Sequence, residues 1–562
     1  MMDWAKKSID VLNLNRQDRL KKTTENFDTN ISDDLLKKYH PDYVGEKRVL
    51  KVGPNSGGLP IPSELANLLE ADSPLLSDFE PTAGLETDVL IIGGGGAGTA
   101  AAISLQESGL KVHLATKLRL GDSNTVMAEG GIQASIGKDD SPRKHFADAF
   151  VGGHGENDSE LLRYLCENGL KSIDWLSKMG CMFDRNNDGT YRLKSGGGTS
   201  IPRVLACRDI TGLEIMRVLR ESIRQGNTHL LENHSAIELL SDGNGSATGA
   251  VLWNSQTKKL LSVSARAVLL ASGGAGQLRI GGTATSNHIG ATGDGLVLAY
   301  RLGCELVNVN SWQYHPSGFC YPEALVGQLA TEALRSLGAQ ILNSSGERFV
   351  NELNFRDKVA AAIIKECEQG KGIQTPSGRK GVWLDLPMVD LQHGKGTLRK
   401  LFSGLVHRLG RFGIQPEKDP ILIYPTLHYQ NGGIKVDRNC QTDAQGLWAA
   451  GEVTGGLHGT NRLMGNSLLD IIVFGRLAGD SIRKNIPERG PMTLKALSGF
   501  RQLLKESNSQ TEKKSPLLFP EESNWKMKIV KDEPLKIDGN GDNSSFKGPP
   551  SFEPPDPFAN RF

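Results

Sequence analysis

The clearest pattern of apolar and polar positions lies in residues 86–116. After a polar start, the apolar, β-branched run Asp88–Ile92 predicts a strand that is buried on both faces. The small residues of Thr99–Ser108 predict a helix that Gly109 ends, and Lys111–Thr116 predicts a second apolar strand. A strand, a helix and a strand within about thirty residues predict a βαβ unit.

Three glycines at the G-x-G-x-x-G spacing connect the first strand to the helix: Gly93, Gly95 and Gly98. Glycine permits a tight turn and lets backbone N–H groups approach a pyrophosphate at the helix N-terminus. A glycine-rich loop alone is a weak signal, but here a strand and a helix flank it in register. The stretch therefore predicts a dinucleotide site rather than a merely structural turn.

Further elements follow along the chain. Amphipathic patterns predict helices over Glu160–Met179 and Asp209–Gln225, and an apolar run predicts a strand over Val263–Leu270. Asp294 stands where another helix begins. Its carboxylate could cap that helix or bind a cofactor, and the two roles are compatible.

The two ends of the chain lack a domain-like pattern. Residues 1–85 predict short helices at Ser32–Tyr39 and from Ser63, joined by the linker Gly53–Pro62, as an extension that packs on this subunit or on a partner. After a predicted helix at Thr493–Leu504, residues 515–562 are rich in Pro, Ser and Asn. They predict a disordered tail or an extended strap on a partner, with widely spaced aromatic residues: Trp525, Phe546, Phe552, Phe558 and Phe562.

Composition narrows the classes of function. The 562 residues include 65 basic and 64 acidic side chains, so no overall field recruits nucleic acid or an anionic membrane. No apolar run reaches the roughly 18 residues of a membrane helix, and the N-terminus lacks the apolar core of a signal peptide. Seven scattered cysteines give no pattern for disulfides, an iron–sulfur cluster or haem. We expect a cytoplasmic protein without a metal site, peripheral to a membrane at most through a partner.

Several motifs match a known family. The second strand ends in Thr116-Lys117, where many dinucleotide folds carry an acidic ribose ligand, and Ser123–Gly131 (SNTVMAEGG) aligns without gaps to a family motif, S-H-T-V-A-A-Q-G-G. The chain resembles the succinate dehydrogenase/fumarate reductase flavoprotein family, which includes L-aspartate oxidase. The resemblance implies FAD rather than NAD as the cofactor.

The resemblance also implies the architecture. We expect an α/β protein in which a Rossmann-like FAD-binding domain carries an inserted α+β capping domain that closes over the isoalloxazine. The expected FAD-binding domain comprises residues 86–308 and 431–484, and the capping domain residues 309–430. The N-terminal extension, 1–85, and the tail, 485–562, lie outside the family pattern.

Asn124 departs from that pattern at a position that carries chemistry. Respiratory members have a histidine there that bonds covalently to the flavin, so we expect FAD to be held non-covalently and to have a lower potential. A helix capped by Ser467 is expected to direct its N-terminus at the flavin. The resemblance implies these cofactor-binding residues: Gly93, Gly94, Gly95, Gly96, Ala97, Gly98, Thr116, Lys117, Leu118, Ser123, Asn124, Thr125, Ala128, Gly130, Gly131, Ala236, Asp294, Glu452, Arg462, Gly465, Ser467 and Leu468.

Segments distant in the sequence match the family's catalytic set, in family order. The resemblance implies that Arg356 is the acid that protonates the substrate, with Glu332 and Arg335 as its proton relay. On a helix these last two are i, i+3 and share a face. Four residues are implied to hold substrate carboxylates: His315, Thr331, His428 and Arg462. Taken singly, each could instead be a core histidine or a charged helix end.

One loop lacks the family's specificity markers. Gly196 stands where fumarate-type members carry an aromatic residue and aspartate oxidases a glutamate, and Thr199 stands where the family has Gln or His. A flexible glycine turn is the alternative interpretation of this loop.

The leading hypothesis is an FAD-dependent oxidoreductase acting on CH–CH groups, interconverting a saturated (di)carboxylic acid and its α,β-unsaturated partner, as in succinate and fumarate. Because the sequence has no cluster or haem motif, electrons should be exchanged with a partner protein such as an iron–sulfur subunit. Two alternatives stay open: L-aspartate oxidase, which Asn124 fits and Gly196 does not, and a subunit whose main task is electron transfer within a complex. A homo-oligomer is also left open.

Overall fold

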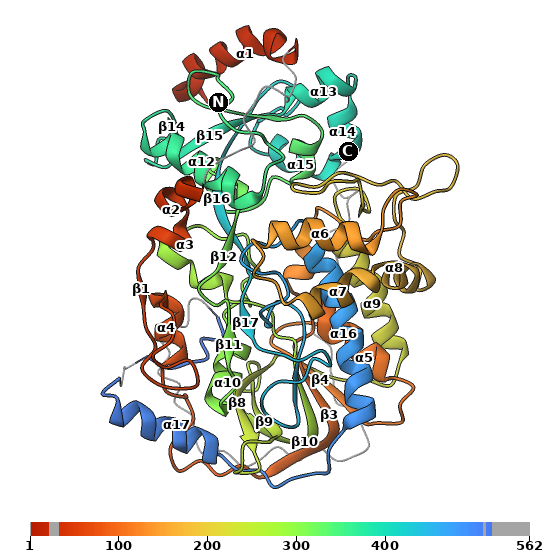
Figure 1. Cartoon of the computed structure of the whole chain (residues 1–562), viewed down its shortest axis with the longest axis vertical. Coiled ribbons are helices and arrows are strands. Elements are labelled where there is room, and N and C mark those ends of the chain that lie inside the picture. Colours follow the sequence, from red (N-terminus) through yellow and green to blue (C-terminus); the bar gives the residue numbers. More distant parts are fainter. Residues whose placement is uncertain (1, 22–32, 510–512, 520–562) are drawn as a thin grey trace, which may run out of the picture.

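A computed structural model describes residues 2–21, 33–509 and 513–519. Two β-sheets follow one another along the long axis of the molecule (Figure 1), with the larger sheet at one end and the smaller sheet at the other. The strands of the smaller sheet all come from residues 312–430, between two parts of the chain that build the larger sheet. The α/β class with an inserted capping unit is confirmed.

The larger sheet has the strand order β7-β4-β3-β10-β9-β8, with β18 also paired to β10. The β3 strand pairs in parallel with β4 and β10, and β4 with β7, whereas β8, β9 and β10 form an antiparallel meander. The bounds are β3 (Ala83–Ile92), β4 (Val112–Thr116), β7 (His229–Glu232), β8 (His234–Ser241), β9 (Ala247–Asn254), β10 (Leu260–Leu270) and β18 (Leu447–Ala449).

Alternate residues of β3 enter two different cores. Val89 and Ile91 pack on the side of α5, α9 and α16, whereas Leu90 and Ile92 pack on the side of α4, α10 and α17. Both faces of the strand are therefore covered, as its continuous apolar run predicts. These helices are α4 (Ser63–Leu69), α5 (Gly96–Leu105), α9 (Thr211–Gln225), α10 (Asp294–Leu302), α16 (Asn466–Asn485) and α17 (Lys495–Glu506).

Two predicted helices have different bounds in the structure. The α5 helix begins at Gly96 rather than Thr99, because its N-terminal glycines already wind as helix, with Gly98 packed closely against Gly93 and Ile91. The helix predicted over Glu160–Met179 is two helices, α7 (Ser159–Glu167) and α8 (Gly169–Lys178), because the backbone leaves helical geometry at Asn168 (φ −101°, ψ 5°).

The smaller sheet has the order β12-β16-β15-β13, with β14 paired to β15, and α12 packs against it. Its elements are β12 (Trp312–Phe319), β13 (Gln340–Leu342), α12 (Arg356–Glu368), β14 (Ile373–Gln374), β15 (Lys380–Asp385), α13 (Pro387–His393), α14 (Thr397–Leu401), α15 (Ser403–Gly410) and β16 (Ile421–Gln430). The remaining elements include α6 (Pro142–Gly152) and three short strand pairs, β1 (Lys47–Arg48) with β2 (Ile61–Pro62), β5 (Ile132–Gln133) with β6 (Val204–Leu205), and β11 (Leu306–Val307) with β17 (Gly433–Ile434).

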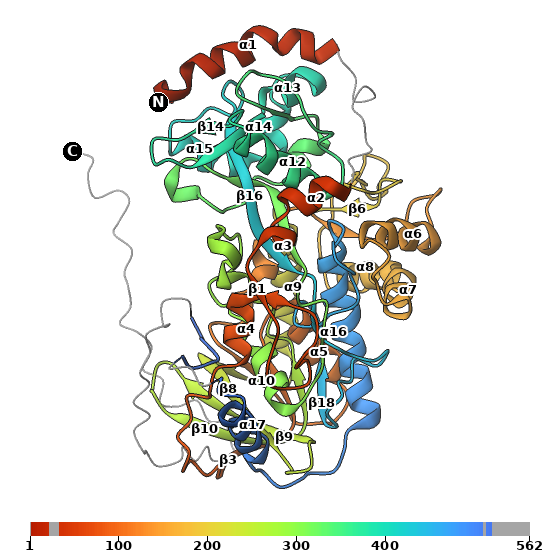
Figure 2. The same ribbon diagram turned by 60° about the vertical axis from the view of Figure 1, so that its left-hand side comes forward.

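The N-terminal extension packs on the same chain. A helix that the sequence analysis missed, α1 (Lys6–Lys21), lies over the capping unit (Figure 2). Arg16 and Arg19 pair with the fully buried Asp385 at 2.9 and 2.8 Å. The predicted helices at Ser32 and Ser63 correspond to α2 (Asp33–Tyr39), followed by α3 (Pro41–Val44), and to α4.

The C-terminal part contains α17, two residues later than predicted, and the segment 513–519, which packs on the larger domain. The aromatic residues of the predicted tail, from Trp525 on, lie outside the described residues. Of the helices in the described residues, none combines the length and the apolar character needed to cross a membrane.

Candidate cofactor and substrate sites

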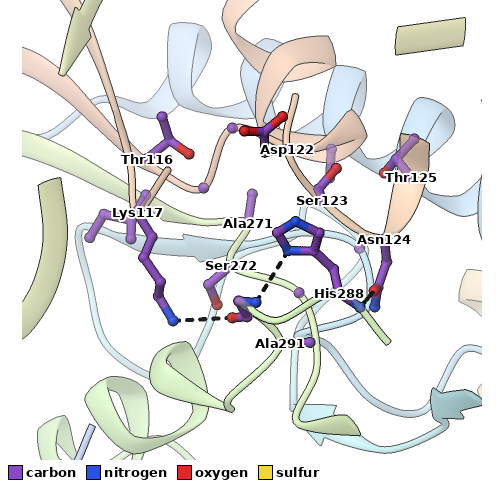
Figure 3. A pocket seen from close by; sticks show the side chains of 18 of the residues that line it. Thr116, Lys117, Asp122, Ser123, Asn124, Thr125, Ala271, Ser272, His288 and Ala291 are labelled. Carbon is purple, nitrogen blue, oxygen red and sulfur yellow. Dashed lines mark hydrogen bonds between the residues drawn. The ribbon is translucent and has the colours of Figure 1, made fainter. Parts of the chain in front are cut away.

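A cavity opens at the carboxyl ends of β3 and β4, against the N-terminus of α5 (Figure 3). This is the edge of a parallel sheet at which dinucleotide folds bind their ligands. Of the expected cofactor residues, these line it: Gly93, Gly94, Gly95, Gly96, Ala97, Thr116, Lys117, Leu118, Ser123, Asn124, Thr125, Ala236, Asp294 and Glu452.

The remaining expected cofactor residues do not line this cavity: Gly98, Ala128, Gly130, Gly131, Arg462, Gly465, Ser467 and Leu468. Gly98 has a packing role, because a Cβ there would lie 1.9 Å from the carbonyl oxygen of Gly93. The prediction that Ser467 caps a helix is wrong. The helix α16 begins at Asn466 after Gly465, whose positive φ of 85° turns the chain into the helix.

Lys117 and Asp294 pair on one wall of the cavity. The Lys117 Nζ lies 2.5 Å from Asp294 Oδ2 and donates to the hydroxyl of Thr292 at 2.8 Å and the carbonyl of Gly290 at 3.1 Å. Asp294 is the first residue of α10, and Gly293 occupies the cap position. The carboxylate therefore faces a lysine and the cavity, in addition to lying at a helix N-terminus.

The residues present fit a dinucleotide such as FAD. The N-terminus of α5 faces the cavity, and a glycine loop keeps the backbone approachable. Ser272, which sequence reasoning missed, also lines the cavity, and its buried hydroxyl has no hydrogen-bond partner within the described part of the chain. A buried polar atom without a hydrogen-bond partner is costly, so a ligand that hydrogen-bonds to this hydroxyl stabilises the site.

Asn124 lies at the opposite end of the cavity from Lys117 (Figure 3). Its amide nitrogen donates to Asn287 at 2.7 Å and to Glu452 at 3.1 Å, and its oxygen accepts from the backbone of His288 at 2.6 Å. Burial raises the pKa of Glu452, whose other oxygen accepts from the backbone of Gln430 at 3.2 Å. No sequence motif marked Asn287 or His288.

A second site lies where the capping unit meets the larger domain, and Glu332 is at its centre. One carboxylate oxygen accepts from Arg356 Nε at 2.8 Å and from Arg335 Nη2 at 3.0 Å, and the other from the backbone of Gly197 at 2.9 Å. Burial alone would raise the pKa of Glu332, but the two arginines lower it to about 2. Glu332, at the start of the short helix α11 (Ala333–Ser336), is therefore an anion.

Gln313, which sequence reasoning missed, joins two arginines. Its side-chain oxygen accepts from Arg356 Nη1 at 2.8 Å and from Arg462 Nη2 at 2.9 Å. Its nitrogen donates to Asn461 at 2.9 Å and to the Arg462 carbonyl at 2.6 Å. Its position could have indicated a role in the site, because it precedes His315 by two residues on β12, and residues i and i+2 of a strand face the same side.

Two histidines complete the cluster as neutral rings. Their centroids lie 5.2 Å apart, and burial together with Arg356 holds the pKa of both His315 and His428 well below the ordinary value. His315 Nδ1 accepts from the backbone of Ser317 at 3.2 Å, and His428 Nδ1 lies 2.8 Å from the hydroxyl of Ser286. Thr331, next to Glu332, is 5 % exposed.

Arg462 reaches the cluster from the loop before α16. Its guanidinium lies 4.3 Å from the Tyr429 ring centroid, and burial together with Arg356 lowers its pKa to about 10. Its Nε is buried without a hydrogen-bond partner among the described residues. The structure thus joins Arg462 to Arg356 through Gln313, and Arg356 and Arg335 to Glu332, which gives the cluster more guanidiniums than paired carboxylates.

The loop at Gly196 turns on itself. The Thr199 hydroxyl donates to the Gly196 carbonyl at 2.9 Å and accepts from its N–H at 3.0 Å. A Cβ at Gly196 would make ordinary contacts of 3.5 Å, so no steric limit requires glycine here. The turn leaves this side of the substrate site without a charged or aromatic group from either residue.

Comparison with known proteins agrees with this geometry. Residues 88–468 match the family described as FAD binding domain. An uncharacterized FAD-dependent oxidoreductase of Methanocaldococcus jannaschii is 38 % identical over 76 % of this chain and 77 % of its own length. A chain of the fumarate reductase (CoM/CoB) of Methanothermobacter marburgensis is 37 % identical over 71 % of this chain and 73 % of its own length. Among solved structures, the FrdA chain of E. coli quinol fumarate reductase has a TM-score of 0.69 and 32 % identity, covering 76 % of this chain and 75 % of that one.

Proposed function

The chain belongs to the FAD-binding flavoprotein family that includes fumarate reductase flavoprotein subunits and L-aspartate oxidases, and we propose that its arginine cluster binds a dicarboxylate substrate. It is an FAD-dependent oxidoreductase of the fumarate reductase/succinate dehydrogenase type. When bound, FAD supplies or accepts the hydride, and the chain's own residues bind the substrate and move the proton.

The charge of the cluster carries the proposal. Arg335 and Arg356 pair with Glu332, and Arg462 shares the Gln313 oxygen with Arg356, so the three buried guanidiniums outnumber the one carboxylate that pairs with them. Burying unpaired positive charge costs free energy unless an anion binds beside it and neutralises it. A dianionic dicarboxylate supplies two negative charges, and its planar carboxylates suit arginine donors.

Each polar group has a proposed role. Arg462, His428, His315 and Thr331 hold the two carboxylates, and the neutral histidines donate or accept hydrogen bonds without adding charge. Arg356 gives the proton to the α-carbon when hydride reaches the β-carbon, and takes it in the reverse reaction. Glu332 accepts hydrogen bonds from Arg356 at 2.8 Å and from Arg335 at 3.0 Å, and these two residues, Glu332 and Arg335, resupply that proton. Gln313 fixes the spacing of Arg356 and Arg462.

We propose that FAD is held by the cavity residues without a covalent link, with the glycine loop at the pyrophosphate and Asn124 toward the flavin. Asn124 has an amide, which is not a nucleophile, in place of a histidine ring. Electrons are exchanged with a partner protein, because several relatives are named as subunits and this chain has no iron site by sequence. Metal analysis of the isolated chain should find no stoichiometric iron, and several iron atoms per chain would contradict this assignment.

A reoxidation screen tests the substrate class. The purified holoprotein is photoreduced without oxygen, unsaturated and amino dicarboxylates are added one at a time, and flavin absorbance is followed. Fumarate or a close analogue should reoxidise the flavin, whereas matched monocarboxylates of the same chain length should not. Reduction of the oxidised flavin by L-aspartate would instead favour the oxidase, and reoxidation by monocarboxylates alone would overturn the charge argument.

A further inference from the structure

Near its C-terminal end the chain folds back on the FAD-binding domain through the segment Lys513–Phe519, here called the strap. Ser515 is fully buried, and its carbonyl and hydroxyl accept hydrogen bonds from Arg301 at 2.8 and 2.7 Å. Arg301 is itself buried and pairs with Glu238 of β8 at 2.9 Å. Leu518 is 1 % exposed in an apolar cluster with residues of β8, β9 and α17. The strap is therefore docked by buried contacts rather than laid on the surface.

The strap ends at the cofactor cavity. The carbonyl of Leu518 accepts a hydrogen bond from Lys117 Nζ at 2.6 Å, and the Phe519 ring centroid lies 5.4 Å from the same nitrogen. Lys117 lines the cavity immediately after β4 (Figure 3). In a dinucleotide fold, the residues that follow this second strand lie beside the ribose of the adenosine half. The strap thus touches the wall of the cavity at its adenosine end.

Lys117 is a flexible side chain that the strap helps to fix. Two of its other partners, Asp294 and Thr292, belong to the start of α10, so Leu518 adds a contact from a separate segment of the chain. Ordering a lysine side chain costs about 2 kcal/mol of rotamer entropy. If the contact with Leu518 has already ordered Lys117, FAD binds without that cost and therefore binds more tightly. Phe519 adds a cation–π contact to the same ammonium.

We propose that the strap is part of the FAD site: it positions Lys117 at the adenosine end and so slows release of the cofactor. Strap docking and FAD binding are then coupled, and the coupling acts in both directions. Lys513–Phe519 are positioning residues, since they act through Lys117. The role lies outside the family's matched region, which ends at residue 468.

Two truncations of the holoprotein test the proposal. One chain ends at Ser509 and loses the strap, and the other ends at Phe519 and keeps it. FAD release is followed by the rise of flavin fluorescence after dilution. Loss of a charge-assisted hydrogen bond should speed release about tenfold in the first chain, while the second stays within about twofold of the parent. Equal release from both chains would overturn the proposal.

The Lys117→Met variant shows whether the strap acts through Lys117. In that background, removal of the strap should change FAD release by no more than about twofold, because the two changes are not independent. A tenfold effect in both backgrounds would overturn the positioning role. If the chain ending at Ser509 does not fold, Leu518→Asp in the full chain undocks the strap by placing a carboxylate in the apolar cluster, with the same expected outcomes.

The reverse coupling has its own readout. Trypsin cuts the bond between Lys514 and Ser515, and Ser515 is fully buried in the docked strap, so cleavage there reports the undocked strap. Saturating FAD should slow release of the C-terminal peptide, measured by mass spectrometry, severalfold in the parent and not in Lys117→Met. Equal cleavage rates with and without FAD in the parent would contradict the coupling.

Discussion

Replacing Arg356 by glutamine should remove the proton donor and leave the cofactor site intact. Arg356 does not line the FAD cavity, so FAD content and the flavin spectrum should match the parent. The substitution removes one guanidinium, which donates to Glu332 and to Gln313 at 2.8 Å each. It therefore removes both an acid and a positive charge that stabilises the developing carbanion.

Those two losses set the magnitude. Loss of an acid costs about 10²–10⁴-fold in rate, so we expect kcat to fall about 10³-fold or more, equal to about 4 kcal/mol in the barrier. Because Glu332 keeps only Arg335 as a cationic partner, its pKa, now lowered to about 2, should rise in the variant. Steady-state reduction of fumarate, or of a surrogate found in the screen, with a reduced viologen dye measures kcat.

Two other arginine variants separate chemistry from packing. Arg462→Gln should weaken substrate binding as well as rate, because it holds a carboxylate that is present in the ground state. Arg19→Gln is the matched control: this buried, ion-paired arginine lies in α1, on the other side of the capping unit, so stability should fall while kcat stays within about twofold. If Arg356→Gln keeps more than about a tenth of kcat with FAD fully bound, the assignment is wrong, and His428 becomes the candidate donor.

Three further expectations concern the cofactor and stability. Acid precipitation should release all FAD, because Asn124 forms no flavin bond; yellow colour in the washed pellet would contradict this. Burial lowers the pKa of His145 in the folded protein to about 4, below the ordinary value of 6.5. As pH falls from about 6.5, His145 is therefore protonated in the unfolded state before it is in the folded state, and the folded state loses stability. His145→Gln should reduce the loss of unfolding free energy between pH 7 and 5 by about 2 kcal/mol in urea titrations, unlike the exposed His393→Gln. Gly98→Ala should abolish FAD binding or folding, since the added Cβ would lie 1.9 Å from a carbonyl oxygen. The control Gly499→Ala should be tolerated, because its added Cβ would have no neighbour within 4 Å. Normal FAD content in Gly98→Ala would refute the close-packing argument.

Local chemistry explains which elements could be predicted. The βαβ unit is predictable because an apolar run, a glycine spacing and a small-residue helix lie within a short stretch. The predicted start of α5 is wrong because glycine is a poor helix former, and only close packing of Gly98 against Gly93 keeps it helical. The residue type of Ser467 suggests a cap, whereas the positive φ of Gly465 sets the start of that helix.

Long-range contacts explain what could not be predicted. The sequence of α1 has no clear apolar stripe, and the helix docks through Leu12, buried in a cluster with Trp383, and through charges paired with Asp385, far along the chain. Gln313 was missed because an uncharged amide gives no catalytic signal until two arginines are seen to share its oxygen. The catalytic set itself could be found only through its family order, since Glu332, Arg356 and Arg462 are brought together by the fold.

The contact between α1 and Asp385 imposes an order of events during synthesis. Arg19 is made 366 residues before its partner. At about 5–20 residues per second, the ribosome needs roughly 20–70 s to supply Asp385 after Arg19 has formed. A helix of 16 residues is only marginally stable alone in water, so α1 must wait as a largely unstructured arm while most of the chain emerges. A segment made hundreds of residues before its partner is thus among the last to find its place.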